Sequence, residues 1–577
     1  MPQPKVKTEV VSSTRSELFP VAGLLAATLL TYASTFTFGW VYDDPPQIPQ
    51  NTNLQWSRLG FLLTHQLWAS TGVAQSRFYR PLLTLWFLVN KSIFGLNPHG
   101  FHVTTVVAHL AATTLAYFIA RSLLKDAGAA LFAAAIFAFH PLQVESASWI
   151  SAVNDPLAAV FCFASFLMCR KARKPESNSA ACWIFSGIFF LLALLTKEVS
   201  VVLPGIVLVD LLSDSQSESR ASSSTHFPLA AFSAFALLTV PWLAVRGGVL
   251  GDAAAVSNPI AHSTILLSAP KIFLFNLYRV AVPVGLSPQY EVHLIDDPNA
   301  QFFVYLLVLA VLVSLAIALA RRDARLWVAY AWLILAVLPT LNLAWMNEDD
   351  FVHDRYMYMS MLGVALLAGF AYAWIRQRWP EQQLIRPLAA ALVLVLAFAS
   401  AIQSQYWAND VILFARAVSR APGNEWAQLN YGSALSSREK FGEAAPHFVR
   451  SYELKPSWRA ADFAGFAYQR SGDLAQGEQW YSAALKFDPN LATAWFGLGQ
   501  IRLAQQLPEQ AIPYLKKALE FDPTADGFHY EMGAALEAVS QPSAAIEEYK
   551  AELQLHPDQS GAQKALDRLQ HADVSAK

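Results

Sequence analysis

The sequence predicts an all-α protein with two parts: a helical domain that crosses a membrane many times, followed by a solenoid of paired helices. The 577 residues are 54% hydrophobic and only 15% charged, whereas soluble domains carry about 25% charged residues. Apolar runs recur as far as about residue 405. Beyond about residue 423 the composition changes, and a repeat of about 34 residues begins.

Composition also limits the classes of function. The formal net charge of −2 argues against nucleic acid as a main partner. The three cysteines lie in or beside apolar runs without a CxxC pair, so they predict neither a zinc site nor a disulfide framework. Residues 1–17 are polar and are expected to form a cytoplasmic tail. The apolar run after them lacks a small-residue cleavage site, which favours a retained first span over a signal peptide.

The membrane domain is predicted to extend over residues 18–410, with about eleven spans. The basic loops between the runs all fall on one side if the runs alternate and if the segment at 264–286 lies in the interface. Lys and Arg are enriched in cytoplasmic loops, so the N-terminus is predicted inside and the C-terminus outside. The predicted spans are the apolar runs at about 18–38, 101–120, 129–140, 153–169, 181–196, 198–212, 227–245, 301–320, 326–342, 357–375 and 387–405.

Two adjacent carboxylates, Asp43 and Asp44, follow the first apolar run directly. Pro45 and Pro46 are predicted to stop the helix and to hold the pair in an extended turn at the membrane surface. Ionisable residues at a membrane span are costly and usually functional. The pair is therefore predicted to be a catalytic centre; the alternative is that both residues cap the end of the span on its water side.

Further ionisable residues are predicted on the same outer side. Lys197 and Glu198 interrupt an apolar stretch, and as neighbours on a helix they do not face each other, so each needs a partner elsewhere. Cations among carboxylates suit a lipid substrate that bears a phosphate, although any one of these residues is also compatible with an ordinary charge at the headgroup level. The residues predicted to contact the phosphate or the sugar are Arg80, His140, Glu145, Lys197, Glu198, Arg279, Tyr290, Arg355 and Tyr356.

The C-terminal part, residues 411–570, contains about four repeats in one register, and a tail at 571–577 follows. This is the tetratricopeptide pattern of paired helices that stack into a superhelix. Its concave surface predicts binding of a polypeptide; the alternative is that the repeats only brace the membrane domain. Because the last span runs outward, the repeats are predicted on the same side as Asp43 and Asp44. The pattern consists of Pro456, Pro489, Pro523 and Pro557 at the ends of units, Gly432, Gly465, Gly499 and Gly533 in the first helices, and Phe448, Tyr481, Leu515 and Tyr549 in the second helices.

Several motifs resemble, in the same order, those of the membrane O-mannosyltransferases that end in tetratricopeptide repeats and share the GT-C glycosyltransferase architecture. The resemblance covers nearly the whole chain. It maps the acidic pair of that family onto Asp43 and Asp44, and it departs from the family at Asp354, where Glu is usual, and at Gln289, where Asp is usual. The matching stretches include Val41–Ile48, Phe78–Thr84, His140–Glu145, Thr196–Glu198, Leu286–Tyr290 and Asp354–Tyr358.

The resemblance implies a membrane glycosyltransferase that moves a sugar, mannose by analogy, from a polyprenyl- or dolichyl-phosphate donor to a hydroxyl group, with protein Ser or Thr as acceptor. One inverting displacement is expected, with Asp43 or Asp44 as general base. Arg355, with Lys197 and Arg80, would hold the phosphate leaving group. The alternatives are a non-catalytic membrane-anchored scaffold and a transferase that acts on a cell-envelope glycan.

No cofactor is predicted. The sequence has no Gly-rich nucleotide-binding loop, which favours a lipid-linked over a nucleotide-linked sugar donor. A divalent metal ion is compatible with the acidic pair, but the resemblance does not require one. The predicted partners are membrane lipid, the lipid-phosphate sugar and a polypeptide bound by the repeats. The short spans and the lack of a retention motif favour a bacterial inner membrane, with the repeats in the periplasm, over a reticular membrane with the repeats in the lumen.

Overall fold

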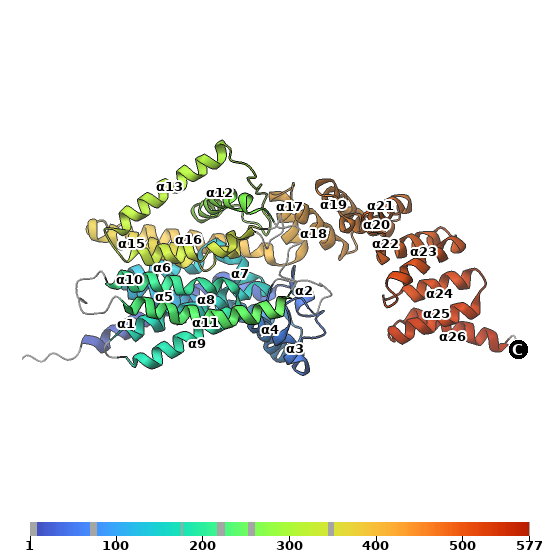
Figure 1. The fold of residues 1–577 in the computed structure, drawn as a ribbon, viewed down its shortest axis with the longest axis horizontal. Coiled ribbons are helices and arrows are strands. Elements are labelled where there is room, and N and C mark those ends of the chain that lie inside the picture. The colour runs from blue at the N-terminus through green and yellow to red at the C-terminus, as the bar shows by residue number, and fades with distance from the viewer. Residues whose placement is uncertain are drawn as a thin grey trace, which may run out of the picture. The chain divides into compact units, whose positions relative to one another are not determined.

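The computed structural model describes residues 9–69, 78–174, 177–215, 226–251, 260–343 and 351–575, which contain helices and no strands. The chain divides into two compact units, Met1–Arg416 and Ala417–Lys577. The predicted all-α class is therefore confirmed. The first unit contains α1 (Glu9–Tyr32), α2 (Asp44–Gln47), α3 (Leu59–Thr64), α4 (Pro81–Phe94), α5 (Pro98–Leu124), α6 (Ala127–Phe139), α7 (Val144–Ser148), α8 (Asn154–Ala172), α9 (Ser179–Thr196), α10 (Leu203–Ser215), α11 (His226–Leu250), α12 (His262–Ala281), α13 (Ala300–Ala320), α14 (Leu326–Leu335), α15 (Met361–Arg378) and α16 (Ile385–Ser404), with α17 (Asp410–Arg420) at the boundary (Figure 1).

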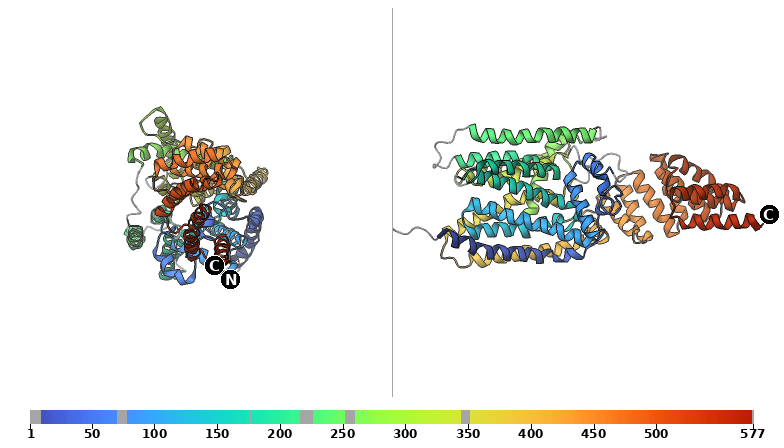
Figure 2. Two further views of the ribbon diagram at one scale, coloured as in Figure 1. Left: turned by 90° about the vertical axis from the view of Figure 1, so that its right-hand side faces the viewer. Right: turned by 90° about the horizontal axis from the view of Figure 1, so that it is seen from below.

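Long helices of this unit run side by side (Figure 2, right). One pair of helical segments, α6 together with Pro141–Ser148, is a further candidate span beside the seven given below, and it is bent by 52° at its break. The segment predicted to lie in the interface forms α12, which is not among the candidates. The count of eleven spans stays a prediction. Among the described residues, seven helical stretches are long and apolar enough to cross a membrane: Leu18–Thr37, Pro98–Leu124, Ile150–Ala172, Ser179–Thr196, Phe232–Leu250, Ala300–Ala320 and Ile385–Trp407.

Two predicted tails are partly helical. The first helix begins at Glu9, inside the predicted N-terminal tail, while residues 1–8 lie outside those described. At the other end α26 (Ser560–Ser575) continues through most of the predicted tail at 571–577. A polar segment continues a helix readily when an adjoining turn has already formed it.

The break after α6 places a polar segment in the middle of the first unit. Pro141 has no backbone N–H and cannot continue the helical ladder, and His140 Nδ1 instead accepts a hydrogen bond from the N–H of Leu142 (3.3 Å). The chain then runs through short helical turns, η3 (Pro141–Gln143), α7 and η4 (Ile150–Val153), into α8. Every residue from 133 to 159 is buried, so the polar side chains of this stretch need partners inside the bundle.

Aromatic and small side chains pack α14 against α8 and α15. Trp332 on α14 is fully buried and packs edge-on against Phe163 (5.2 Å between ring centroids) and Phe166 (5.5 Å) of α8. A Cβ atom on Gly363 would lie 2.4 Å from the backbone nitrogen of Leu333. Glycine at this position therefore lets α15 approach the backbone of α14.

The second unit consists of four helix pairs and a final helix. A Cβ atom on Gly432 would lie 2.7 Å from the ring of Phe448, and Gly465 and Tyr481 show the same relationship at 2.8 Å. The predicted register of the repeats is therefore found in the structure. The pairs are α18 (Glu425–Ser436) with α19 (Phe441–Leu454), α20 (Trp458–Ser471) with α21 (Leu474–Phe487), α22 (Ala492–Ala504) with α23 (Pro508–Phe521), and α24 (Phe528–Ala538) with α25 (Pro542–Leu555).

Candidate active site

The acidic pair lies in a tight helical turn. Tyr42 has a positive φ of 55°, Asp43 has right-handed helical dihedral angles, and Asp44 begins the one-turn helix α2. The predicted extended turn is therefore wrong. Prolines are well tolerated in the first turn of a helix, where their missing N–H would have no partner in any case.

The Asp44 carboxylate is fully buried and holds the loop onto the broken-helix segment. Its Oδ1 accepts hydrogen bonds from the N–H (2.8 Å) and the hydroxyl (2.6 Å) of Ser151. Its Oδ2 accepts a hydrogen bond from the N–H of Val41 (3.1 Å). Three donors on one carboxylate leave little capacity for another ligand.

The Asp43 carboxylate has a different environment. It is partly exposed and makes no hydrogen bond or ion pair with the part of the chain that the structure describes. It lines a cavity of about 330 Å³, which also receives side chains from the loop before α4, the α9–α10 junction and η10 (Asp354–Met357). The adjacent carboxylates are thus separated into one that is bonded and one that faces the cavity.

The pKa values of both carboxyls are shifted upward. Burial raises the pKa of Asp43 to about 6, with Arg355 opposing the shift and Asp410 adding to it. Burial likewise raises the pKa of Asp44 to about 7, against the lowering effect of its hydrogen bonds to Ser151 and Val41. A carboxylate with a pKa near 6 is a stronger base than an exposed one and is still mostly ionised at neutral pH.

Two of the cations that line the cavity form ion pairs beside it. Arg80 binds Glu198 through two bonds, with Nε donating to Oε2 at 3.0 Å. Lys197 Nζ donates to Asp155 Oδ1 at 2.5 Å. The expectation that Lys197 and Glu198 have separate partners is therefore confirmed, although both residues lie at the junction between α9 and η5 (Glu198–Val202) rather than on one regular helix.

Arg355 is held by a buried carboxylate and by aromatic rings. Its Nη1 donates to Glu145 Oε1, and its backbone N–H donates to Glu145 Oε2 at 3.1 Å. Its guanidinium carbon lies 4.9 Å from the ring centroid of Trp149 and 5.3 Å from that of Tyr356. These contacts fix the guanidinium at the wall of the cavity and leave several of its N–H groups available.

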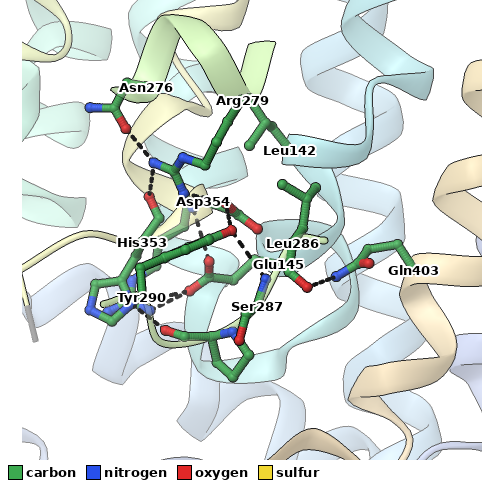
Figure 3. A network of polar contacts seen from close by, with 12 residues as sticks. Leu142, Glu145, Asn276, Arg279, Leu286, Ser287, Tyr290, His353, Asp354 and Gln403 are labelled. Carbon is green, nitrogen blue, oxygen red and sulfur yellow. Dashed lines mark hydrogen bonds and ion pairs between the residues drawn. The ribbon is translucent and has the colours of Figure 1, made fainter. Parts of the chain in front are cut away.

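A second polar network joins Arg279, Tyr290 and Asp354 (Figure 3). Arg279 on α12 donates to Asp354 and to Asn276, and the Tyr290 hydroxyl donates to Asp354 Oδ1 at 2.7 Å. Arg279 is 2% exposed and Asp354 is 4% exposed. The network ties the segment after α12 to η10 and thereby positions Arg355, the residue that follows Asp354.

The predicted site residues thus occupy two layers. Asp43, Arg80, Lys197, Glu198, Arg355 and Tyr356 line the cavity. Asp44 and Glu145 are bonded behind the cavity wall, as are Arg279 and Tyr290 in the second network. His140 Nε2 bonds to the carbonyl oxygen of Val280 (3.0 Å), away from the cavity.

Some residues at the site were not among the predicted ones. Ser151 and Asp155 hold Asp44 and Lys197, and Trp149 lies under Arg355. Arg246 also lines the cavity. The signal in the sequence was the run of polar residues that follows His140, but the sequence alone did not indicate which long-range partner each of them has.

Metal-ligating side chains were also considered. Over the described ranges, one group of three such residues has ligand atoms close enough to share an ion, namely Asp526, Glu552 and His556 in the second unit. Asp43 and Asp44 are not part of such a group. Because Asp44 already accepts three hydrogen bonds, the pair does not present two open carboxylates to an ion.

Comparison with known proteins places this geometry in context. A family model described as dolichyl-phosphate-mannose-protein mannosyltransferase matches residues 79–244, and a tetratricopeptide repeat model matches residues 492–524. Protein O-mannosyl-transferase TMTC1 of Homo sapiens is 24% identical over 76% of this chain and 56% of its own length. The chain is thus similar to the protein O-mannosyl-transferases of the TMTC type.

Other proteins of this type match the chain to different extents. TMTC4 of Homo sapiens is 23% identical over 71% of this chain and 63% of its own length. Tmtc1 of Drosophila melanogaster is 31% identical over 35% of this chain and 24% of its own length. The chain spans a little more than half the length of the first curated relatives that it matches.

Two solved structures are similar to parts of this chain. ArnT from Cupriavidus metallidurans in the apo state covers 82% of this chain and 80% of its own, with a TM-score of 0.39 and 15% identity. YrrB, a tetratricopeptide protein with an unusual peptide-binding site, covers 34% of this chain and 97% of its own, with a TM-score of 0.25 and 16% identity.

The two departures from the TMTC-like motifs have different outcomes in the structure. Asp354 is shorter than the usual Glu, yet it reaches both Arg279 and Tyr290. Gln289 is 1% exposed, and neither atom of its amide has a hydrogen-bond partner within the described chain. Asp354 is therefore part of a bonded network, whereas Gln289 is a buried amide without a partner in the described chain.

Proposed function

We propose that this chain is a membrane glycosyltransferase that moves mannose from a polyprenyl- or dolichyl-phosphate donor to a hydroxyl group of a polypeptide. One observation carries the proposal: the unpaired carboxylate of Asp43 faces the same cavity as four cationic side chains. These are Arg80, Lys197, Arg246 and Arg355, whereas the carboxylates on the cavity wall are Asp43 and Glu198. The counter-carboxylates Asp155 and Glu145 lie behind the wall, so the cavity surface favours an anion.

Phosphate binding is assigned to Arg355, Arg80 and Lys197. Each has an ion-pair partner that orients it, and each retains N–H groups beyond those used in its ion pair. Donors held in fixed positions stabilise the charge that develops on a leaving phosphate without reorganising. Tyr356 lines the cavity between Arg355 and Lys197 and is assigned to the sugar or its phosphate.

The reaction is one displacement at the anomeric carbon. Asp43 accepts the proton of the acceptor hydroxyl while the hydroxyl oxygen forms its bond to that carbon. The bond between the carbon and the phosphate oxygen breaks, and its electron pair leaves with the lipid phosphate. Attack opposite the leaving group inverts the anomeric configuration.

Asp44 is assigned a positioning role. Its bonds to Ser151 and Val41 lock the turn that carries Asp43, and a locked rotamer and backbone keep a base within reach of its proton. This division assigns the base to Asp43, a choice that the sequence left open between the two residues.

Binding of the acceptor polypeptide is assigned to the second unit. Tetratricopeptide superhelices present concave surfaces that bind extended polypeptides, and we place this unit on the outer side of the membrane, as the direction of the last span predicts. We further propose a bacterial inner membrane, with the repeats in the periplasm. A reticular membrane, with the repeats in the lumen, is the alternative location.

The decisive test is consumption of a purified polyprenyl-phosphate mannose by the intact protein in detergent, where water takes the place of the acceptor hydroxyl. Intact protein should release lipid phosphate, and Asp43→Asn should reduce the rate by about two to four orders of magnitude. If Asp43→Asn turns over like the intact protein, the assignment of the base is wrong. If the intact protein consumes neither mannose nor glucose donors, a non-catalytic scaffold becomes the better interpretation, and activity that does not need the repeats favours a glycan acceptor.

A further inference from the structure

A second cavity lies in the membrane unit, away from the candidate active site. It has a volume of about 970 Å³ and is lined by residues of α1, α6, α15 and α16. Its charged lining residues include Lys125 and Asp126, directly before α6. Ser151, the partner of Asp44, follows the other end of α6. The two cavities share no lining residue.

The cavity lining includes cations from three different elements. Lys125 closes α5, Arg376 lies in the last turn of α15, and Arg386 lies in the first turn of α16. One carboxylate stands among them: Asp126 Oδ2 is 3.5 Å from Arg376 Nη1, and its Oδ1 accepts the N–H of Ala129 at 2.7 Å. Over the described residues, the side chains of Lys125 and Arg386 have no ion-pair partner.

Apart from these charged residues, the cavity lining is mainly apolar. Its wall on α6 runs from Gly128 to Phe139, a distance of about 17 Å at 1.5 Å per residue. Small side chains on the facing helix, Ala389 and Ala390, widen the slot beside Leu131. The hydrocarbon core of a bilayer is about 30 Å thick, so the slot has the length of one acyl chain in one leaflet.

We propose that this cavity binds one anionic phospholipid, with its phosphate among Lys125, Arg376 and Arg386 and one acyl chain along α6. Basic pockets between helices on the cytoplasmic side are suited to anionic headgroups. The basic loops place this end of the bundle on that side. Two unpaired cations favour an anionic over a zwitterionic headgroup, and a slot between helices suits a lipid chain better than a polypeptide.

The proposal is independent of the transferase activity. The four helices that line the cavity come from both ends of the first unit's sequence, with α1 and α16 lying side by side (Figure 2, right). A ligand that bridges them binds the folded state alone and therefore stabilises it by mass action. The bound lipid would act as a brace between the first and the last helix of the membrane unit.

Native mass spectrometry of the intact chain, released from detergent after titration with dioleoyl phosphatidylglycerol or dioleoyl phosphatidylcholine, tests the proposal. The two probes have the same acyl chains and differ in headgroup charge. We expect one tightly retained phosphatidylglycerol per chain. Lys125→Gln with Arg386→Gln should weaken its affinity by about tenfold or more, because the variant removes two cations that attract the anionic headgroup.

Two further variants separate charge from shape. Arg321→Gln with Arg322→Gln removes two exposed cations from another loop at the same end, away from the cavity, and should leave the affinity unchanged. Ala390→Phe keeps the charges but fills the slot from the exposed face of α16, where folding tolerates the change. It should weaken retention of phosphatidylglycerol. The melting temperature of each variant in detergent shows that it is folded.

Four results would overturn the proposal. One is equal retention of phosphatidylglycerol and phosphatidylcholine. A second is unchanged affinity in the folded Lys125→Gln, Arg386→Gln variant. A third is an equal loss of affinity in the Arg321→Gln, Arg322→Gln control. The last is displacement of phosphatidylglycerol by polyprenyl phosphate at equal concentration, which would assign the cavity to the sugar donor instead.

Discussion

Asp44 accepts hydrogen bonds from both the backbone N–H and the hydroxyl of Ser151, which lies 107 residues further along the chain. This contact joins the turn after the first span to the segment that follows the break after α6. It also turns the Asp44 carboxylate away from the cavity that Asp43 lines. The contact thus separates two neighbouring carboxylates into a positioning residue and a candidate base.

Substitution of the two carboxylates should therefore have different consequences. Asp43→Asn should leave the fold intact and lower turnover by about two to four orders of magnitude. Asp44→Asn should lower the melting temperature, because it weakens three buried hydrogen bonds. Ser151→Ala is the matched control for Asp44, since it removes one of the same bonds without touching either carboxylate. Equal loss of activity in Asp43→Asn and Ser151→Ala, with equal loss of stability, would contradict the division of roles.

The pH dependence of turnover should report the ionisation of Asp43. A general base acts in its unprotonated form, so the rate should rise with pH through about 6, the raised pKa of this carboxyl. The negative charge of Asp410 also raises the pKa of Asp43. Asp410→Asn should therefore lower the pKa of Asp43 and move the acidic limb of the rate profile to lower pH. A limb that stays in place, or moves to higher pH, would exclude Asp43 as the titrating group.

The Arg355–Glu145 pair should show the cost of an unpaired buried charge. The Glu145 side chain is 1% exposed, so Arg355→Met should destabilise the membrane unit by about 3–5 kcal/mol. Adding Glu145→Gln should restore most of the stability, because the unpaired charge is gone, but should not restore turnover. Thermal unfolding in detergent and donor consumption, measured on the same samples, separate the two effects. Recovery of turnover in the double variant would show that Arg355 does not act on the leaving group.

The repeat unit offers a matched pair of glycines. In Gly432→Ala the new methyl group would lie 2.7 Å from the Phe448 ring, and such overpacking costs about 1–3 kcal/mol. In Gly442→Ala, on the next helix, it would meet nothing within 4 Å, and alanine favours the helix. Hydrogen exchange of the intact chain should show protection in α18 and α19 falling by about tenfold to a hundredfold in the first variant only. Similar protection in both variants would mean that the repeat relaxes around Phe448.

Much of the architecture was predictable because it depends on contacts near in sequence. The repeat register follows from glycines and large residues that belong to the two helices of one pair, as Gly465 and Tyr481 do. Apolar runs predict helices for the same local reason. The outer ends of the first and last helices were not predicted, and α1 and α26 both extend into segments predicted as tails.

The sequence by itself determined the two-part all-α organisation, the repeat register and the identity of the acidic pair. It also indicated that Lys197 and Glu198 need separate partners. Only the tertiary structure decided that those partners are Asp155 and Arg80, and that Asp43 rather than Asp44 faces the cavity. The physical reason is that periodicity and spacing report the faces of local elements, whereas ion pairs between residues 42 to 210 positions apart depend on how the whole bundle packs.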